Sequence, residues 1–327
     1  MLGKIKVTPL AAESFGARSM CTFVETPDVK VLLDAGVSLC PNRFGLLPHP
    51  IEFRTIAKLR TRIAEFADKA EVVTISHYHF DHHTPSYEDW VVNWTEAQET
   101  ARQIYEGKTV LMKNPKETIN ASQRQRAWMF QKTGGKHAEK LETADGKTFT
   151  FGKDTALRFS EPVFHGPENS MLGWTIMTLI ECGGERFMFA PDVQGPISTR
   201  TLELIKAADP QVIMIGGPPL YLSFKVEEAQ LQAGLKNLAA IAENVPLTII
   251  EHHALRDEQW QQKTRQVYEI AQKAGHTVMT AAEFAGQENT FLEFNRKRLY
   301  AEYPLSEEFK KWMRGGSNAK NISKPPT

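Results

Sequence analysis

The stretch TISHYHFDHHTP, residues 74–85, holds four histidines and an aspartate within the seven positions 77 to 83. It follows an apolar run, EVVTIS (71–76), which has the composition of a buried strand. The histidines therefore lie in the loop at the C-terminal end of a strand, where open α/β sheets usually carry their functional groups. A folding core does not bury imidazoles without polar partners, so other parts of the chain must supply partners for them.

The residue types and spacing of this loop are typical of a metal site. His77 and His79 are two positions apart and project to one side of an extended backbone. Asp81 and His82 follow directly, so three imidazoles and a carboxylate can serve two adjacent metal ions, since neutral imidazole and carboxylate oxygen are the usual zinc ligands. We expect His83 to be a bystander beside the ligands. Ten histidines in the whole chain rarely produce such a cluster by chance on a surface.

Two metal ions need further ligands, and three other segments offer them, each at the end of an expected strand. EPVFHGP (161–167) offers His165, and FMFAPDVQGP (187–196) offers Asp192, a single carboxylate that can bridge both ions. PLTIIEHHALRD (246–257) offers His252 or His253. Taken alone, each of these residues is more often a turn or cap residue. Because they occur in this order after the first cluster, the set together strongly indicates a site for two metal ions.

These motifs resemble those of the metallo-β-lactamase superfamily. HYHFDH (77–82) matches the HxHxDH signature of that superfamily, and Asp34 in VLLDAG (31–36) matches its first motif. His165, Asp192 and the pair at 252–253 fall at the third, fourth and fifth motifs. The resemblance runs from about residue 5 to residue 260. Within the superfamily, the chain resembles an uncharacterised, mainly archaeal hydrolase group, through ESFGARSMCTFVET (13–26), LDAGVSLCPNRFGLLPHPIE (33–52), ISHYHFDHHTP (75–85) and GGPPLYL (216–222).

The resemblance implies a four-layer αββα sandwich with two metal ions at one rim of the β layers. Three residues would hold the first ion: His77, His79 and His165. The second would be held by Asp81, His82 and the histidine of the last motif, with Asp192 as the bridge. Asp34 would orient a ligand by hydrogen bonding instead of binding the metal; the alternative is a plain turn residue. Asp81 and Asp34 are thereby the candidate catalytic carboxylates. Zinc is the expected metal, with manganese and iron as alternatives that accept the same ligands.

The last motif departs from the family pattern because it has two adjacent histidines where one is needed. Adjacent residues at a strand end point to opposite faces, so we expect one of them to reach the metals. The pattern does not decide which one, and we slightly favour His253 over His252. Glu251, Arg256 and Asp257 are expected to fix this turn.

The rest of the chain reads as one α/β domain, 1–314, with a helical insertion at about 84–148. Strands are expected at 4–10, 20–25, 29–34, 71–76, 147–151, 156–164, 174–182, 186–190, 211–217 and 246–251. Helices are expected at 51–69, 95–106, 116–132, 198–208, 226–244 and 256–274. Two batches of strands, each followed by strand-helix alternation, favour two packed β layers with helices outside. The tail 315–327 (GGSNAKNISKPPT) is expected to be disordered.

The composition excludes several classes of protein. Of the 327 residues, 41% are hydrophobic, enough for a sizeable core, and 39 basic residues balance 39 acidic ones. Zero formal charge argues against a strongly basic coat for nucleic acid. Three widely spaced cysteines, Cys21, Cys40 and Cys182, fit neither a disulfide framework nor a metal knuckle, and we expect them to be buried apolar residues. Without a signal segment or a run of 18 apolar residues, a cytoplasmic protein with no membrane partner is expected.

The expected function is metal-dependent hydrolysis by a water that two metal ions activate. No GxSxG motif supplies a nucleophile. A phosphodiester in a nucleotide or nucleic acid is the favoured substrate, because arginine suits phosphate recognition. Arg18, Asn42, Arg43 and Tyr221 are the candidate substrate-binding residues, each with an ordinary surface role as the alternative. A locally basic stretch, 108–136, is either a solvated face or a phosphate-facing patch.

Other functions remain open at the level of sequence. A lactone, thioester or amide is an alternative substrate, and a small molecule is an alternative to a nucleic acid. A di-iron redox protein and a non-catalytic metal-binding scaffold are alternatives from other classes. A homo-oligomer is compatible with the composition, and segment 84–148 is long enough to serve as a lid, a substrate platform or a subunit contact.

Overall fold

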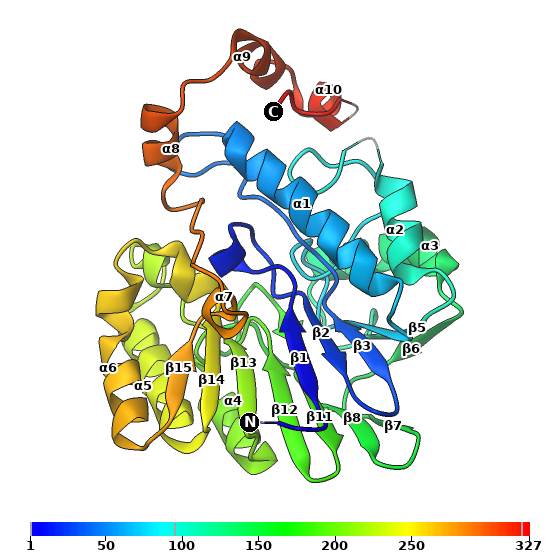
Figure 1. Ribbon diagram of the computed structural model, residues 1–327, viewed down its shortest axis with the longest axis vertical. Coiled ribbons are helices and arrows are strands. Elements are labelled where there is room, and N and C mark those ends of the chain that lie inside the picture. The colour runs from blue at the N-terminus through cyan, green and yellow to red at the C-terminus, as the bar shows by residue number, and fades with distance from the viewer. Residues whose placement is uncertain (1, 95, 322) are drawn as a thin grey trace.

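Two β-sheets pack face to face, and helices cover their outer sides (Figure 1). The computed structural model describes residues 2–94, 96–321 and 323–327. The first sheet has six strands in sequence order, namely β1 (Lys6–Pro9), β2 (Thr22–Glu25), β3 (Lys30–Leu33), β4 (Val72–Ile75), β5 (Thr109–Met112) and β6 (Lys140–Thr143). β1 to β3 are antiparallel, and β3 to β6 are parallel.

The second sheet has seven strands in the order β15-β14-β13-β12-β11-β8-β7. Their bounds are β7 (Thr148–Phe151), β8 (Thr155–Phe159), β11 (Thr178–Cys182), β12 (Glu185–Ala190), β13 (Val212–Gly216), β14 (Leu247–Glu251) and β15 (Thr277–Met279). β12 to β15 are parallel, so their carboxyl ends meet at one rim. A small hairpin of β9 (Val163–Phe164) and β10 (Trp174–Thr175) stands apart from both sheets.

Alternation along β12 shows how the layers pack. Phe187 and Phe189 belong to the core between the two sheets, while Met188 and Ala190 belong to a second core under the outer helices. Successive side chains of a strand point to opposite faces, so the second sheet is buried on both sides. Thr22 of the first sheet reaches Met214 of the second with its hydroxyl, 3.1 Å from the sulfur. The expected four-layer αββα sandwich is therefore confirmed.

Helices form the outer layers. The helices after strands of the first sheet are α1 (Pro50–Ala67), α2 (Ala97–Tyr105) and α3 (Ala121–Lys132). Those of the second half are α4 (Thr199–Ala208), α5 (Glu228–Asn244) and α6 (Trp260–Lys273). Pro50 begins α1 because its missing N–H is not needed there, and His49 and Glu52 cap it reciprocally.

Segment 84–148 differs from the expected helical insertion. It does contain α2, α3 and the short turn η2 (Gly134–His137), but it also adds β5 and β6 to the first sheet. α3 begins at Ala121 and not at 116, because the Asn120 side chain caps it by accepting from the Gln123 N–H at 2.8 Å.

The C-terminal residues carry helices that the sequence pattern did not predict. They are α7 (Ala281–Phe284), α8 (Arg296–Glu302), α9 (Glu307–Met313) and α10 (Ser317–Asn321). α10 lies in the tail expected to be disordered, where the Lys320 ammonium sits 4.9 Å from the Trp90 ring and 5.9 Å from the Trp312 ring. Contact between a cation and aromatic faces stabilises such a segment.

Two expectations drawn from composition concern the cysteines and membrane-spanning helices. The three cysteines are free and buried, as expected. Within the described part of the chain, no helix combines the length and the apolar character that crossing a membrane requires.

Candidate metal centre

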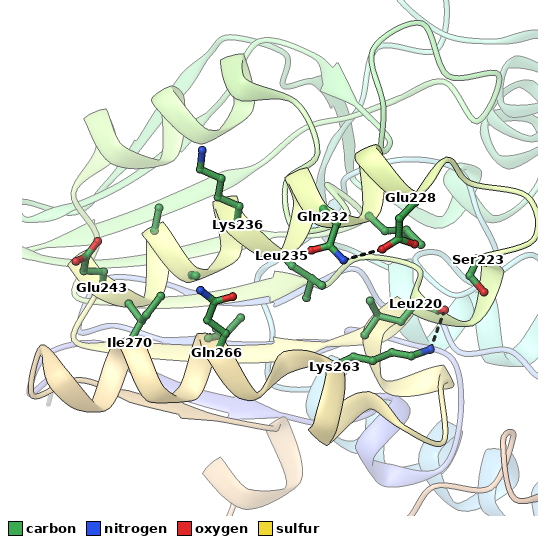
Figure 2. A pocket seen from close by; sticks show the side chains of 14 residues that line it. Leu220, Ser223, Glu228, Gln232, Leu235, Lys236, Glu243, Lys263, Gln266 and Ile270 are labelled. Carbon is green, nitrogen blue, oxygen red and sulfur yellow. Dashed lines mark hydrogen bonds between the residues drawn. The ribbon is translucent and has the colours of Figure 1, made fainter.

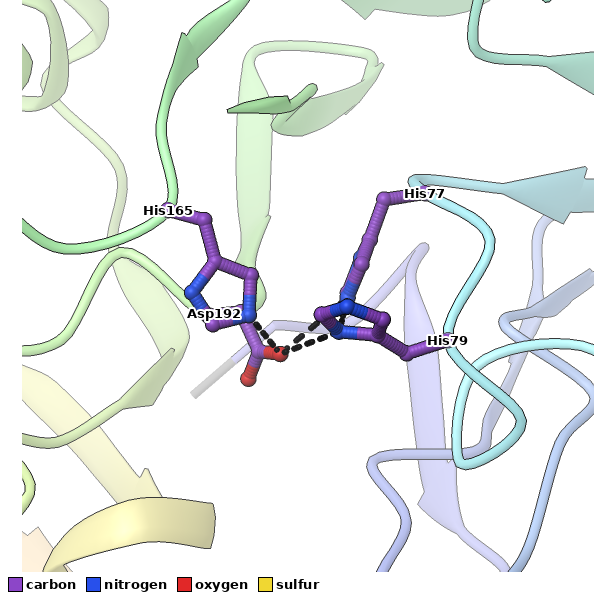
Figure 3. A group of neighbouring side chains, drawn as sticks. All are labelled: His77, His79, His165 and Asp192. Carbon is purple, nitrogen blue, oxygen red and sulfur yellow. Dashed lines mark hydrogen bonds and ion pairs between the residues drawn. The ribbon is translucent and has the colours of Figure 1, made fainter. Parts of the chain in front are cut away.

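The histidine-rich loop lies at the rim where the two sheets present their carboxyl ends. His77, His79, Asp81 and His82 follow β4, and Asp34 follows β3. From the other half, Asp192 follows β12, His252 follows β14, and His165 follows the hairpin strand β9. Figure 3 shows His77 and His79 facing His165 and Asp192 across this rim. The sandwich thus brings together all five motifs.

Backbone strain marks three of these positions. Asp34, Asp192 and His252 have φ angles of 47°, 55° and 65°, in the left-handed region that side chains with a Cβ rarely adopt. Such strain costs on the order of 1–3 kcal/mol per residue and collects at functional sites. Gly36 is needed for a related reason, because a Cβ there would collide with the backbone of His82 and His83.

One group of ligand atoms comprises nitrogens of His77, His79 and His165 and an oxygen of Asp192. His77 Nε2 lies 3.0 Å from His79 Nδ1 and 3.1 Å from Asp192 Oδ2. His165 Nε2 and His79 Nδ1 lie 2.7 and 3.9 Å from the same oxygen. Ligands about 2.0–2.1 Å from a tetrahedral ion are roughly 3.4 Å apart, so these separations fit one ion.

A second group comprises Asp81, His82 and His252. His252 Nε2 lies 3.3 Å from Asp81 Oδ2 and 3.4 Å from His82 Nε2. Asp192 reaches this group as well, because its Oδ1 lies 3.1 Å from His252 Nε2 and its Oδ2 3.4 Å from His82 Nε2. Asp192 therefore stands between the two groups, as its expected bridging position requires.

Several atoms of this centre are buried without a hydrogen-bond partner. They are His165 Nε2, Asp192 Oδ1 and His253 Nε2. A buried polar atom left unpaired costs about 1–3 kcal/mol, so three in one place indicate that something else completes the site. A set of imidazole nitrogens and carboxylate oxygens suits divalent transition metals. The residues present therefore fit a pair of metal ions.

Hydrogen bonds to the Nδ1 atoms of His77 and His82 direct the Nε2 lone pairs of these residues into the centre. The Ser76 hydroxyl donates to Asp34 Oδ2, so it accepts from His77 Nδ1 at 3.0 Å. Asp34 Oδ2 also lies 2.8 Å from His82 Nδ1, and its Oδ1 accepts from the Ser76 N–H at 2.8 Å. With the hydrogen on Nδ1, each imidazole presents the Nε2 lone pair to a metal. The Asp34 carboxylate is thus placed as the resemblance implies.

Glu13 and Arg256 also contact the centre, and no sequence pattern indicated a role for Glu13. Glu13 Oε1 lies 3.3 Å from His252 Nδ1 and accepts from Arg256 Nε at 2.6 Å. Arg256 Nη2 is 3.2 and 3.1 Å from the two ring nitrogens of His252. Glu13 and Arg256 therefore both contact the ring of His252. Glu13 and Arg256 are 243 residues apart in the chain, which local sequence patterns cannot relate.

The electrostatics of the pocket favour a bound cation. Burial raises the pKa of Asp192, but the nearby His252 and His165 outweigh this and hold it well below its usual range. Burial and the neighbouring His82 hold the pKa of His77 well below the ordinary histidine value. Burial lowers the pKa of His82, yet Asp192 and Asp34 raise it far more. The pocket thus contains an ionised carboxylate and attracts positive charge at the His82 edge.

Both histidines of the last motif reach the centre, which corrects the expectation that only one can. They begin a 3-10 turn, η4 (His252–Arg256), and do not continue the β14 strand, so the strand rule of opposite faces does not apply to them. His252 lies with Asp81 and His82, and His253 forms a further group with Asp192 and His252, its Nε2 lying 3.4 Å from Asp192 Oδ1. His252 therefore belongs to both groups, whereas the sequence slightly favoured His253.

The candidate substrate-binding residues divide into two pairs. Arg18 forms a two-pronged ion pair with Glu293 at 2.6 and 2.7 Å, and Asn42 accepts from the Gly45 N–H in its own loop. Both have structural partners. Arg43 and Tyr221 lie beside the centre: the Arg43 guanidinium is 4.7 Å from the Tyr221 ring, and that ring is stacked on His253 at 6.5 Å.

The basic stretch 108–136 does not form one phosphate-facing patch. Lys113 is buried and paired with Asp145 at 2.5 Å, and buried Lys108 reaches the Glu106 carbonyl. Arg126 is different, because its guanidinium lies 5.0 Å from the ring of Phe80, the residue between His79 and Asp81. His83, expected to be a bystander, hydrogen-bonds through Nδ1 to the His79 carbonyl at 2.9 Å.

A separate cleft of about 840 Å³ lies between α5 and α6 in the outer helical layer. Figure 2 shows it lined by Leu235 and Ile270 on facing helices, with Lys236, Glu243 and Gln266 around them. Lys263 reaches the Leu220 carbonyl at its end. None of the candidate metal ligands lines this cleft.

Known proteins of similar sequence share most of this chain. A UPF0282 protein of Pyrobaculum islandicum is 42% identical over 91% of the chain and 95% of its own length. The UPF0282 protein of Methanocaldococcus jannaschii is 40% identical, over 93% of the chain and 100% of its own length. That of Thermococcus gammatolerans is 45% identical, over 78% and 84%. No family model matches the chain.

Solved structures with a similar fold are more distant. CmlA, a diiron beta-hydroxylase from Streptomyces venezuelae, has a TM-score of 0.47 and 12% identity, over 86% of this chain and 53% of that one. Human tRNase Z, short form, has a TM-score of 0.41 and 10% identity, over 75% and 92%.

Proposed function

The chain belongs to the UPF0282 family, and from the geometry of its centre we propose that it is a metal-dependent hydrolase of phosphodiesters. The observation that carries the proposal is the convergence of two ligand groups on one carboxylate, Asp192. Two-metal sites of this kind are widespread among enzymes that hydrolyse phosphoesters.

Seven residues would hold the two ions. His77, His79 and His165 would bind the first, and Asp81, His82 and His252 the second, with Asp192 shared between them. Bound divalent ions supply Lewis acidity and lower the pKa of water toward neutrality. Asp34 keeps the imidazole of His82 in the tautomer whose lone pair faces the ions, and Glu13 lies against Nδ1 of His252. The protein needs no nucleophile of its own.

The side chains of the centre differ in how deeply they are buried, and this difference supports one direction of approach for the substrate. His77, His82 and His252 have fully buried side chains, whereas those of His79 and Asp81 are 23% and 14% exposed. A substrate would therefore meet the centre from the side of His79 and Asp81. Phe80, which lies between them in sequence, is partly exposed on the same loop.

Cations paired with aromatic rings near this opening favour a phosphodiester over an uncharged ester. Arg43 lies over the rings of Phe44 and Tyr221, at 4.6 and 4.7 Å, and Arg126 lies over Phe80. Arg43 Nε is buried without a hydrogen-bond partner and lies 3.9 Å from Glu293 Oε1, while its Nη2 donates to the Arg256 carbonyl at 3.0 Å. Guanidinium groups recognise phosphate oxygens, and exposed rings with neighbouring cations suit stacked nucleobases. Phe44 is 46% exposed.

The proposal is tested by assaying the purified protein, loaded with zinc, manganese or iron, on bis(p-nitrophenyl) phosphate. We expect turnover that EDTA abolishes and that returned metal restores. A parallel panel of lactones and thioesters measures the preference. Hydrolysis of that panel without hydrolysis of the phosphodiester would contradict the substrate assignment, and no turnover on any of them with two ions bound would contradict hydrolysis.

A further inference from the structure

His253 lies at the metal centre, but its surroundings differ from those of the ligands. Its side chain is 10% exposed, and its Nε2 lies 3.4 Å from Asp192 Oδ1. That nitrogen has no hydrogen-bond partner. The imidazole is stacked on the ring of Tyr221, with 7° between the two planes, so the His253 side chain is held in one orientation.

The position of the ring hydrogen decides what a neutral imidazole can do. One ring nitrogen carries the hydrogen and donates, and the other carries a lone pair and can bind a metal. In His82, Nδ1 faces the Asp34 carboxylate, which only accepts, so the hydrogen is on Nδ1 and the lone pair on Nε2. The Nε2 atom of His82 is the one that faces the centre.

The arrangement at His253 is the reverse. Its Nδ1 lies 3.2 Å from Nη1 of Arg256, and a guanidinium group can only donate. Arg256 is itself fixed, because its Nε donates to Glu13 at 2.6 Å and its Nη1 is 3.4 Å from the Tyr221 hydroxyl. Nδ1 of His253 therefore accepts, and the ring hydrogen lies on Nε2, the nitrogen that faces the centre.

We propose that His253 is not a metal ligand and donates its Nε2–H to a phosphoryl oxygen of the bound substrate. This inference rests on the proposed function of the centre. A fixed donor aimed at an oxygen that gains negative charge stabilises it without rearrangement. Arg256 and Tyr221 act as positioning residues, since they set the tautomer and the plane of the His253 ring and do not touch the substrate themselves.

The test compares His253→Ala and His253→Gln with His252→Ala in metal-loaded protein. Metal content is measured first, and the affinity for inorganic phosphate is then measured by calorimetry. His253→Ala should keep both ions and bind phosphate about tenfold more weakly, which is the loss of one hydrogen bond. His253→Gln, whose amide N–H extends to the position of Nε2, should restore most of the affinity. His252→Ala should lose one ion.

Two results would overturn the inference. Loss of one ion in both His253 variants would make His253 a ligand, and unchanged phosphate affinity in His253→Ala would remove its role as a donor. Failure of the proposed function gives a different outcome, because wild-type protein would then bind metal and phosphate without hydrolysing any phosphodiester. If His253→Ala does not fold, the Gln variant still separates the ligand role from the donor role.

Discussion

At the scale of single residues, Asp192 is the point where the two halves of the centre meet. Its two oxygens lie within 3.5 Å of ring nitrogens from both ligand groups. It comes from the second sheet, whereas His77, His79, Asp81 and His82 come from the first. A carboxylate shared in this way contributes to both metal ions at once.

Replacing Asp192 with Ala should therefore remove both ions, whereas His77→Ala should weaken mainly one. Metal content of the purified variants, measured by mass spectrometry, checks this. Asp154→Ala is a matched control, since Asp154 has a side chain 62% exposed and only a weak ion pair with Lys4. Two ions retained in the Asp192 variant would contradict the bridging role.

The contact between the Asp34 carboxylate and Nδ1 of His82 leads to a second prediction. Asp34→Asn should lower metal affinity by roughly 10–100-fold, because an amide no longer fixes the His82 tautomer. The measurement is a competitive titration against a chromophoric chelator. Ser76→Ala keeps the carboxylate but removes a donor to Asp34 and the acceptor for His77 Nδ1, so it should also lower the affinity. An Asn variant with wild-type affinity would leave Asp34 without an orienting role.

The ligand set was predictable from sequence because the HxHxDH pattern places much of the chemistry in one short segment. Glu13 was not predictable, since its partners Arg256 and His252 are distant in the chain. The choice between His252 and His253 also could not be made from sequence. It depends on the 3-10 turn after β14, which brings a ring nitrogen of each histidine within 3.4 Å of Asp192.

At the scale of elements, helices α1 to α6 and most strands followed the predicted pattern, whereas β5, β6, β15 and the C-terminal helices were not predicted. β5 and β6 have four residues each, and each gains its strand character from parallel pairing with a neighbour in the sheet. α8 and α9, of seven residues each, are held by tertiary contacts. Isolated helices of that length are marginal in water, so their sequences carry little signal.

Arg296 of α8 illustrates such a contact. It is fully buried and donates to both oxygens of Glu52 on α1, at 2.7 and 2.8 Å, and to the Cys40 and Leu46 carbonyls. The loop between Cys40 and Leu46 contains Arg43 and Phe44, which lie near the opening of the centre. α8 thus anchors the loop that carries the proposed phosphate-binding arginine.

Arg296→Ala should destabilise the protein by about 3–5 kcal/mol, because it leaves the buried Glu52 carboxylate unpaired. Arg298→Ala is the control on the same helix: its side chain is 70% exposed, and its loss should leave the stability almost unchanged. Urea unfolding of both variants provides the comparison. Equal stabilities would mean that the Arg296 cluster does not hold α8 in place.

At the scale of the whole molecule, the metal centre joins the two sheets. Residues that could hold metal follow β4, β12 and β14 and meet at one rim, so bound ions would act as cross-links between the halves of the sandwich. The layered fold was predictable, because the superfamily resemblance and the two batches of strands agree. The similarity to archaeal UPF0282 proteins confirms the narrower resemblance to an archaeal group.

Removing the ions should lower the stability of the folded protein. Ions that bind only the native state add a free energy that grows with their concentration over Kd, about 4 kcal/mol at a thousandfold excess. Calorimetric scans with and without EDTA should show a lower Tm in EDTA, restored by excess metal. In Asp192→Ala, EDTA should leave the Tm unchanged; an equal shift in the variant would place the stabilising ions elsewhere.

The most direct test of the two-metal centre is an anomalous difference map from crystals of the metal-loaded protein, recorded at the absorption edge of that metal. We predict two peaks: one bound by His77, His79 and His165, the other by Asp81, His82 and His252, with Asp192 between them and no bond to His253. A single peak, or none, at this rim would contradict the two-metal centre.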